Sequence, residues 1–365
     1  MNASRYLPFL GRALRSEGPP LHLTLFVTGV CNARCRHCFH WKEVEAGVSG
    51  PSLEEVERLA ESSSRMGPLL WVSFGGGEPF LRRDLAKLGR AFGKRGLRHL
   101  AIPTNGLVEA HQHEITAELA RENPDTYLTV SVSFDGPPEI HDSIRQVPGG
   151  HARSSESVRK FLKQKEEHDN LGVGILLCVT QENQDTLADH MEELVRELRP
   201  DNVTINLARG TAMEEHLLEV DPARYREVVE RKKQLVEQGL LPYFDFPLGR
   251  LAVARDRVVY DQIAAQSEGK AAKYLPCTAG RLSAVIFEDG SVHPCEILGK
   301  SMGNLNEVDW NLDKLWQEHA AKDLRKEIHR TRCTCTWECA QADNVLFNVR
   351  SWPRLARAYA RVEHR

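Results

Sequence analysis

The chain of 365 residues has an ordinary composition, with 41% hydrophobic residues, 27% charged residues and a formal net charge of −3. This balance is typical of a globular protein with a large core, and the length suggests two domains. The slightly acidic charge predicts no general attraction to nucleic acid or to an anionic membrane. The sequence shows neither a membrane span nor the core of a secretion signal, so we expect a cytoplasmic protein.

The nine cysteines fall into two groups, at 31–38 and at 277–339, with Cys178 alone between them. In a chain without a secretion signal, such clustering favours metal ligation over disulfides. Cys178 lies in an apolar run typical of a buried strand, and we expect it to be a core thiol.

The first two thirds of the chain alternate β-prone and amphipathic segments. Helices are predicted over Leu53–Met66, Asp84–Arg95 and Thr186–Leu198. Ser52 and Glu55 fit a capping box at the start of the first of these. Six strands alternating with helices imply a parallel sheet with right-handed crossovers, either open or curved into a partial barrel. The predicted strands are Leu21–Val27, Leu69–Phe74, His99–Pro103, Tyr127–Phe134, Val173–Val179 and Val203–Leu207.

The loops after the first two predicted strands carry the residues with the clearest chemical meaning. The first contains Cys31, Cys35 and Cys38, one thiolate fewer than a 4Fe–4S cluster normally takes, which would leave one iron open. The second contains Gly75–Pro79, and 36 residues, about one βαβ unit, separate it from Cys38. Both loops should therefore emerge at the same edge of adjacent strands, where ligands collect.

Each loop also has a simpler interpretation. The cysteines with His37 or His40 could form a Cys3His zinc site. The three glycines, Gly75–Gly77, could form a tight turn, although they could also let the backbone approach a ligand closely. A phosphate-binding P-loop is disfavoured because no Gly-Lys-Ser/Thr follows.

Together the two loops resemble the radical SAM superfamily, whose hallmark is Cys-x3-Cys-x-aromatic-Cys, with His37 here at the aromatic position. The resemblance covers roughly residues 20–210 and implies a partial (β/α)6, TIM-like barrel that is open on one side. It implies a 4Fe–4S cluster on Cys31, Cys35 and Cys38 whose open iron chelates S-adenosylmethionine. It also implies that Gly76–Pro79 hold the methionyl amino group of that molecule.

Further matches to the superfamily follow the third and fourth strands. Asn105 lies in a Thr-Asn-Gly turn, and Ser133 and Arg145 lie in a segment that the family places near the cofactor's ribose and carboxylate. A surface turn or an N-cap is the alternative for each. The expected cofactor-binding residues are His37, Gly75, Gly76, Gly77, Glu78, Pro79, Asn105, Ser133 and Arg145.

The pattern changes from about Leu241. Asp289-Gly290 between two β-prone runs predicts a hairpin, which would bring Cys277 near Cys295. A helix is expected over Leu312–Ile328. We expect an N-terminal helix at 1–20, the barrel at 21–240, a linker at 241–274, a small α+β iron–sulfur domain at 275–345 and a C-terminal helix at 346–365.

The C-terminal cysteines are Cys277, Cys295, Cys333, Cys335 and Cys339. The first two, spaced Cys-x12-Gly-x4-Cys, resemble the opening of the SPASM and twitch extensions, which carry auxiliary 4Fe–4S clusters. The last three depart from the SPASM ending, and five thiolates cannot fully ligate two cubanes, so one auxiliary 4Fe–4S cluster is expected. We expect its ligands to be the first two, Cys339, and either Cys333 or Cys335. A structural zinc is the alternative.

The resemblance implies reductive cleavage of S-adenosylmethionine to a 5′-deoxyadenosyl radical that takes a hydrogen atom from a substrate. We expect an oxidoreductase acting on a small polar metabolite of the sugar or aminocyclitol type, with flavodoxin or ferredoxin as electron donor. The alternatives are a maturase of a ribosomally made peptide and a non-catalytic, zinc-stabilised binding module. No catalytic acid or base is identified, because Glu296, His293 and Glu338 beside the auxiliary cysteines are expected to be exposed or merely supporting residues.

Overall fold

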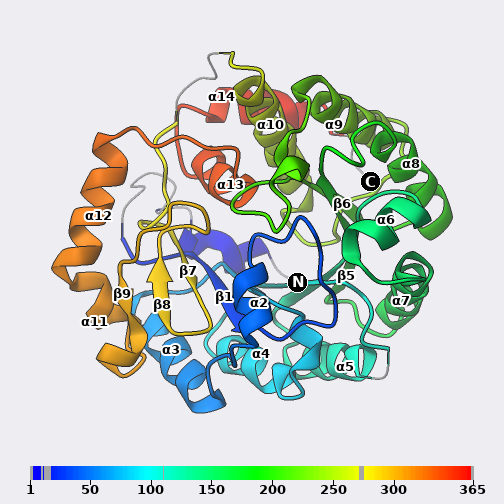
Figure 1. Ribbon diagram of the computed structural model, residues 1–365. Coiled ribbons are helices and arrows are strands. Elements are labelled where there is room, and N and C mark those ends of the chain that lie inside the picture. Colours follow the sequence, from blue (N-terminus) through cyan, green and yellow to red (C-terminus); the bar gives the residue numbers. More distant parts are fainter. Residues whose placement is uncertain (1–2, 10, 12–17, 110, 271–274, 363–365) are drawn as a thin grey trace.

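The computed structural model describes residues 3–9, 11, 18–109, 111–270 and 275–362. Within these residues one sheet runs through the molecule (Figure 1). Its strands are β1 (His22–Thr28), β2 (Trp71–Gly76), β3 (His99–Thr104), β4 (Tyr127–Phe134), β5 (Leu171–Val179), β6 (Asn202–Leu207), β7 (Ser283–Ile286), β8 (Ser291–His293) and β9 (Gly303–Asn304). They are ordered β6-β5-β4-β3-β2-β1-β7-β8-β9.

The six N-terminal strands are parallel and form the predicted partial barrel, which does not close. Helices surround them on the outside (Figure 1). This confirms the expected α/β class, and each predicted strand lies within two residues of an observed one at both ends. Helix α2 (Trp41–Ala46) lies in the middle of the view in Figure 1 and contributes residues to the cavity wall. The helices around the barrel are α3 (Leu53–Met66), α4 (Leu85–Gly93), α5 (Gln112–Glu122), α6 (Pro138–Arg145), α7 (Gly150–Lys165), α8 (Leu187–Leu198) and α9 (Pro222–Glu237).

Local signals in the sequence explain where several of these elements begin. The Ser52 side chain accepts from the Glu55 amide at 3.2 Å, and the Glu55 carboxylate accepts from the Ser52 amide at 2.7 Å. The predicted capping box is therefore present and starts α3 at Leu53. Short 3₁₀ turns lie at Ala3–Tyr6, Pro79–Leu81, Glu215–Leu218 and Leu305–Val308.

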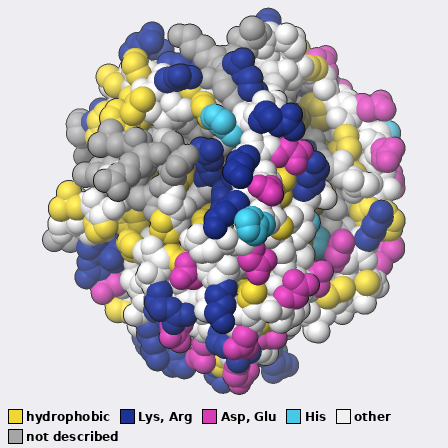
Figure 2. Space-filling view, turned by 90° about the vertical axis from the view of Figure 1, so that its left-hand side faces the viewer, with side chains coloured by type: hydrophobic (Ala, Val, Ile, Leu, Met, Phe, Trp, Pro, Cys, Tyr) yellow, Lys and Arg dark blue, Asp and Glu magenta, His cyan; other side chains and the backbone are white. Residues whose placement is uncertain are grey.

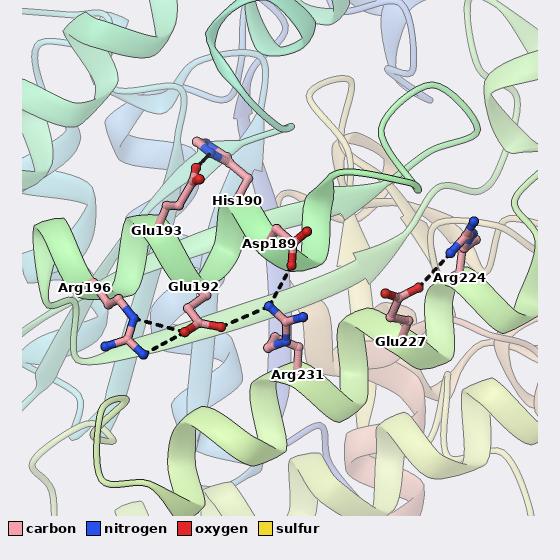
Figure 3. Close-up of polar contacts among 8 residues, drawn as sticks. All are labelled: Asp189, His190, Glu192, Glu193, Arg196, Arg224, Glu227 and Arg231. Carbon is pink, nitrogen blue, oxygen red and sulfur yellow. Dashed lines mark hydrogen bonds and ion pairs between the residues drawn. The ribbon is translucent and has the colours of Figure 1, made fainter.

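Ion pairs join the two outer helices α8 and α9, as Figure 3 shows. Arg231 of α9 donates to Asp189 at 2.8 Å and to Glu192 at 2.9 Å, both on α8. The neighbouring Lys232 is buried instead, with its ammonium 4.8 Å from the centre of the Tyr260 ring. Burial lowers the pKa of Lys232 to about 8.

The structure corrects two expectations for the rest of the chain. The expected linker at 241–274 contains a 19-residue helix, α10 (Gly249–Ser267), which packs against α9, α13 and α14 and is buried on several sides. The single helix expected over Leu312–Ile328 is divided at Glu318, whose backbone is extended. Of the expected N-terminal helix at 1–20, residues 3–9, 11 and 18–20 are described, with a 3₁₀ turn at Ala3–Tyr6, and the other positions lie outside the described residues. The C-terminal helices are α11 (Leu312–Gln317), α12 (His319–Arg330), α13 (Glu338–Leu346) and α14 (Trp352–Ala360).

The C-terminal region continues the barrel sheet. Strand β7 pairs parallel to β1, with Leu25 opposite Ile286, and β8 and β9 follow it antiparallel. The hairpin predicted at Asp289-Gly290 is the turn between β7 and β8. Because β7 lies directly beside β1, the two cysteine groups belong to neighbouring parts of one sheet.

The surface on the side of α11 and α12 carries basic and acidic side chains mixed together, as Figure 2 shows. This agrees with the near-neutral net charge of the chain. Among the described helices, none combines the length and the hydropathy needed to cross a membrane.

The buried His99 predicts a loss of stability in acid. Its Nε2 lies 2.9 Å from the Tyr6 hydroxyl, its ring stacks on Trp71, and burial lowers its pKa to about 3. An unfolded chain protonates this histidine near pH ~6.5. At a pH between these two pKa values, His99 is protonated in the unfolded chain but not in the folded protein. Stability should therefore fall as the pH drops from about 6.5 towards 3, by about 1.4 kcal/mol per pH unit.

The measurement is urea unfolding of wild type and His99→Gln at several pH values, since glutamine keeps a partner for Tyr6 and does not titrate. The variant should show a shallower decline of unfolding free energy in acid. His329→Gln, at an exposed position on α12, is the matched control and should leave the slope unchanged. Equal slopes for His99→Gln and wild type would contradict the account.

Candidate active site

The loop with the first three cysteines and the glycine loop are in backbone contact. The Gly77 amide donates to the Thr28 carbonyl at 2.6 Å, and the Glu78 amide donates to the Val30 carbonyl at 2.9 Å. A Cβ atom on Gly76 would lie 2.2 Å from the Thr28 oxygen, and one on Gly77 would lie 2.2 Å from the Val30 oxygen. These two glycines are therefore required by the contact between the loops.

The Glu78 carboxylate connects the glycine loop to the loop after β3. It accepts from the Phe80 amide at 3.1 Å, from the Thr104 hydroxyl at 2.8 Å and from the Asn105 amide at 2.8 Å. Burial raises the pKa of Glu78, and the three donors partly oppose that rise. The Asn105 side chain in turn donates to Asn32 of the cysteine loop at 2.7 Å. Three loops at the carboxyl edge of the sheet are thus joined.

A fourth loop is fixed by a buried ion pair. Arg145, at the end of α6, has its Nε 2.7 Å from the Asp135 carboxylate that follows β4, and the Asp135 side chain is fully buried. The cysteine loop binds this segment through its backbone, because the Arg36 amide donates to the Ile144 carbonyl at 2.8 Å. Asp135 was not among the residues expected for the site. Its position directly after a predicted strand is the signal in the sequence that could have identified it.

The three loop thiols are largely buried and face one cavity. Burial raises the pKa of Cys35 to about 12 and that of Cys38 to about 11. Metal ligands must be thiolates, so metal binding here releases protons. His37 points towards Asp135, with 4.0 Å between its Nε2 and Oδ1, and burial lowers its pKa.

The donors at this loop fit an iron–sulfur cluster. The three cysteines line one cavity, and cysteine thiolates are the usual ligands of such clusters. The two histidines that could complete a Cys3His zinc site face carboxylates instead, His37 that of Asp135 and His40 that of Glu288. The site of Cys31, Cys35 and Cys38 therefore suits a cluster with one iron not bound by protein.

The cavity has a volume of about 490 Å³ and lies inside the barrel. Of the nine expected cofactor-binding residues, eight line it, and only Pro79 lies behind the wall. Much of the wall consists of small polar side chains on the inner strand faces, namely Thr24, Ser73, Thr129, Ser131, Ser133 and Thr204. Cys178 also lines this cavity, which corrects its expected place in the core, because alternate residues of β5 face the barrel interior.

The wall of the cavity also contains Arg209, which follows β6 and was not among the residues predicted from the sequence. Its guanidinium donates to Glu338, and another of its nitrogens lies 3.7 Å from the Glu296 carboxylate. Burial lowers the pKa of Arg209, but Glu338 and Glu296 more than offset this and raise it overall. Burial raises the pKa of both glutamates. Neither glutamate carboxylate is exposed, so the expectation that these residues lie on the surface is wrong for both. His293 is half-buried against Phe287.

The C-terminal cysteines lie near this wall. The β7–β8 hairpin brings Cys277 and Cys295 into one apolar cluster around Trp337, as predicted from the hairpin. The Cys333 thiol is within hydrogen-bonding reach of Cys277. The Cys339 side chain lies in the first turn of α13 and lines the cavity.

The two cysteine regions are linked by an aromatic contact and a hydrogen bond. His40, two residues after Cys38, lies 2.5 Å from the Glu288 carboxylate in the β7–β8 turn. Phe26 of β1 packs edge-on against Phe287, with ring centres 4.8 Å apart. The position of the hairpin therefore depends on the loop that carries the first cysteines.

Comparison with known proteins gives two family matches. Residues 25–194 match the model of the Radical SAM superfamily, and residues 277–340 match SPASM, an iron-sulfur cluster-binding domain. The AdoMet-dependent heme synthase of Oleidesulfovibrio alaskensis is 31% identical over 155 residues, which is 42% of this chain and 38% of that protein. The antilisterial bacteriocin subtilosin biosynthesis protein AlbA of Bacillus subtilis is 24% identical over 334 residues, 88% of this chain and 66% of that protein.

The alignments thus span less than two thirds of the length of either relative. Among solved structures, Streptococcus suis SuiB bound to its precursor peptide SuiA superposes with a TM-score of 0.62 at 16% identity. That match covers 88% of this chain and 70% of SuiB. At this identity the likeness is one of fold.

The network around Glu78 predicts that its amide analogue is destabilising. Glu78→Gln would turn an NH2 group towards donors that now meet a carboxylate, leaving buried groups unsatisfied at a cost of about 1–3 kcal/mol. Urea unfolding of the metal-free protein measures this loss. Glu61→Gln, at an exposed position on α3, is the matched control and should change stability by less than about 0.5 kcal/mol. A Glu78→Gln protein as stable as the control would show that the carboxylate does not hold the loops.

Proposed function

Because this chain belongs to the radical SAM superfamily and carries a C-terminal SPASM domain, we propose that it is a maturase that oxidises or crosslinks a ribosomally made peptide. Its cofactors are a 4Fe–4S cluster, S-adenosylmethionine and an auxiliary iron–sulfur cluster in the SPASM domain. When bound, they supply a 5′-deoxyadenosyl radical that removes a hydrogen atom from the substrate. A one-electron donor of the flavodoxin or ferredoxin type would deliver the electron.

We expect residues at the mouth of the barrel to bind and orient the cofactors. Cys31, Cys35 and Cys38 hold the cluster, while Glu78 fixes the glycine loop relative to Asn105. The other residues that we expect to contact S-adenosylmethionine, among them His37, Ser133 and Arg145, line the cavity.

An ionic clamp joins the cysteine loop to two other loops. Arg36 of the cysteine loop donates to Glu182 at 2.8 Å and to Glu214 at 2.7 Å, which come from the loops after β5 and β6. In the proposal these bonds hold the cysteine loop in place while the cofactors bind.

The observation that carries the choice of substrate is the likeness to proteins named for peptide modification. The cavity is compatible with that choice: its 490 Å³ are lined by residues of the cysteine loop and by Arg209 and Cys339. A pocket of this size suits one ligand of moderate size, so a peptide would insert a side chain into it. A small metabolite would fit the same space, and the size of the cavity does not separate the two.

Most of the arginines in the cavity are paired with carboxylates. Arg145 is paired with Asp135, Arg209 with Glu338 and Arg255 with Asp256. Arg34 also lines the cavity and donates to the backbone carbonyls of Cys31 and Ala33. A heme precursor carries several carboxylates, which would need more such cations than this one. The relative named as a heme synthase is therefore the less suitable guide to substrate.

The named relatives favour the peptide alternative over the first expectation. AlbA is named for bacteriocin biosynthesis, and SuiB was solved with a precursor peptide. Neither these nor the heme synthase is named for a sugar or an aminocyclitol, so that expectation has no support from them. Membership in a superfamily of enzymes does not fit the non-catalytic zinc module.

The first test is cofactor cleavage. Anaerobic protein reduced with dithionite should convert S-adenosylmethionine to 5′-deoxyadenosine, measured by chromatography, and Cys35→Ala should abolish this because the cluster loses one of three ligands. The retained auxiliary iron, about half of the total, serves as the control for folding. Unchanged turnover in the variant would overturn the assignment of the loop.

The second test is substrate class. Short peptides encoded beside the gene, an aminocyclitol and iron-coproporphyrin III are each incubated with the reduced enzyme and S-adenosylmethionine. Mass spectrometry should show a peptide that has lost two hydrogen atoms, with the two small molecules unchanged. Consumption of either small molecule with no change in any peptide would contradict the proposal.

A further inference from the structure

The inner faces of the barrel strands form layers, because neighbouring parallel strands are paired residue by residue. The lowest layer is aromatic and consists of His22, Trp71, His99 and Tyr127, which are paired in that order across β1 to β4. Their ring centres lie 6.3, 5.0 and 6.1 Å apart along the row, which is the spacing of aromatic contacts. We call this layer the aromatic floor, and it lies at the amino end of the strands.

The segment between α9 and α10 adds two rings to this end of the barrel. The centre of the Phe246 ring lies 4.6 Å from that of His99. Phe244 packs on β5, where a Cβ atom on Gly172 would lie 2.8 Å from its ring. The amino end of the barrel is therefore built largely from aromatic rings.

The layer above the aromatic floor carries small side chains. Thr24, Ser73, Ala101 and Thr129 occupy the positions two residues further along β1 to β4 and are again paired in that order. All four line the cavity. The interiors of such barrels are normally filled by Val, Ile and Leu, so these small residues explain why open space remains above the floor.

The hydroxyl groups of this region are available to a ligand. Thr24, Ser73 and Thr129 make no hydrogen bond through their side chains in the part of the chain that the structure describes. The same is true of Ser131 and Thr204, which line the cavity further along their strands. We call these five residues the hydroxyl ring. Each hydroxyl can both donate and accept, so together they offer hydrogen bonds of both kinds.

We infer that the hydroxyl ring binds an uncharged substrate side chain that ends in an amide or a hydroxyl. The inference rests on the proposed function for the peptide, whereas the chemistry of the site rests on the barrel residues themselves. It narrows the side chain that enters the cavity to asparagine, glutamine, serine or threonine.

The charged groups of the cavity wall argue against an ionic side chain. Arg255 lies 2.6 Å from Asp256, and His22 of the aromatic floor lies 3.4 Å from Asp343. Arg34 makes no ion pair among the described residues, but it belongs to the cysteine loop, at the opposite end of the strands from the floor. A charged side chain at the hydroxyl ring would therefore be buried without a counterion, which is costly.

An apolar side chain would also fit the hydroxyl ring poorly. It would displace water from the hydroxyls and leave them without partners, and unsatisfied buried polar groups are unfavourable. An amide or a hydroxyl on the substrate replaces the lost water contacts. Amides supply two donors and one acceptor oxygen, which suits a ring of groups that both donate and accept.

Ligand-observed NMR tests the site without a peptide. Saturation-transfer spectra of the holoprotein are recorded with propionamide, propionate and propylammonium at equal concentrations. Propionamide should show the strongest transfer. The double variant Ser73→Ala, Thr129→Val should weaken that signal about fivefold, because hydrogen bonds to the probe are lost. Thr331→Val, at the exposed end of α12, is the matched control and should leave it unchanged.

Two results of this experiment would overturn the inference. One is transfer to propionate or propylammonium that equals the transfer to propionamide. The other is a propionamide signal that the double variant does not change. The comparison of the three probes on the wild-type protein gives an answer even if the double variant fails to fold.

The modified peptide gives the second test. Tandem mass spectrometry of the product should place at least one modification at an asparagine, glutamine, serine or threonine. Thr129→Val should raise KM for the peptide about fivefold, and Thr331→Val should not. Modification confined to charged, aliphatic or aromatic residues would overturn the inference and leave the proposed function intact. Selective binding of propionamide without modification of any peptide would contradict the proposed function instead.

Discussion

The backbone contact between the loop after β1 and the loop after β2 is the constraint on which the site depends. Two carbonyls of the cysteine loop accept from consecutive amides of the glycine loop, at 2.6 and 2.9 Å. That approach is possible only where Gly76 and Gly77 have no Cβ atom. The Glu78 carboxylate then extends the contact to the loop after β3, and the position of three thiols is fixed by a chain of neighbouring loops.

The same sheet also sets the distance between the two cysteine regions. Because β7 pairs with β1, the hairpin that carries Cys277 and Cys295 begins beside the strand that leads to the first cysteines. His40 and Glu288 connect the regions directly. Cys31, Cys35 and Cys38 line the barrel cavity, and from the C-terminal group Cys339 lines it as well. The six parallel strands around this cavity do not close into a full barrel.

The sequence predicted the parts of this structure that local patterns determine. The six strands, the capping box of α3 and the hairpin at Asp289-Gly290 follow from apolar runs, capping residues and turn residues. The cysteine and glycine loops were placed together because parallel strands end at one edge. Such patterns involve residues that are close together in the chain, and they were sufficient to predict these elements.

Features that depend on tertiary contacts were not predicted. Helix α10 has a weak amphipathic pattern, since it is buried on several sides, and it was taken for a linker. The role of Arg209 follows from its ion pairs with Glu338 and Glu296, which are far away in the sequence. The spacing of the last three cysteines did not reveal that Cys339 lines the cavity, because this depends on where α13 begins and on how it packs against the barrel.

The central claim is that the three-thiol loop holds a cluster with one iron open to S-adenosylmethionine. Electron paramagnetic resonance of the reduced protein, recorded before and after addition of S-adenosylmethionine, tests it most directly. The account predicts that the signal of one cluster shifts on addition and that the signal of the auxiliary cluster does not. Spectra that are identical with and without S-adenosylmethionine, in protein with a full iron content, would contradict it.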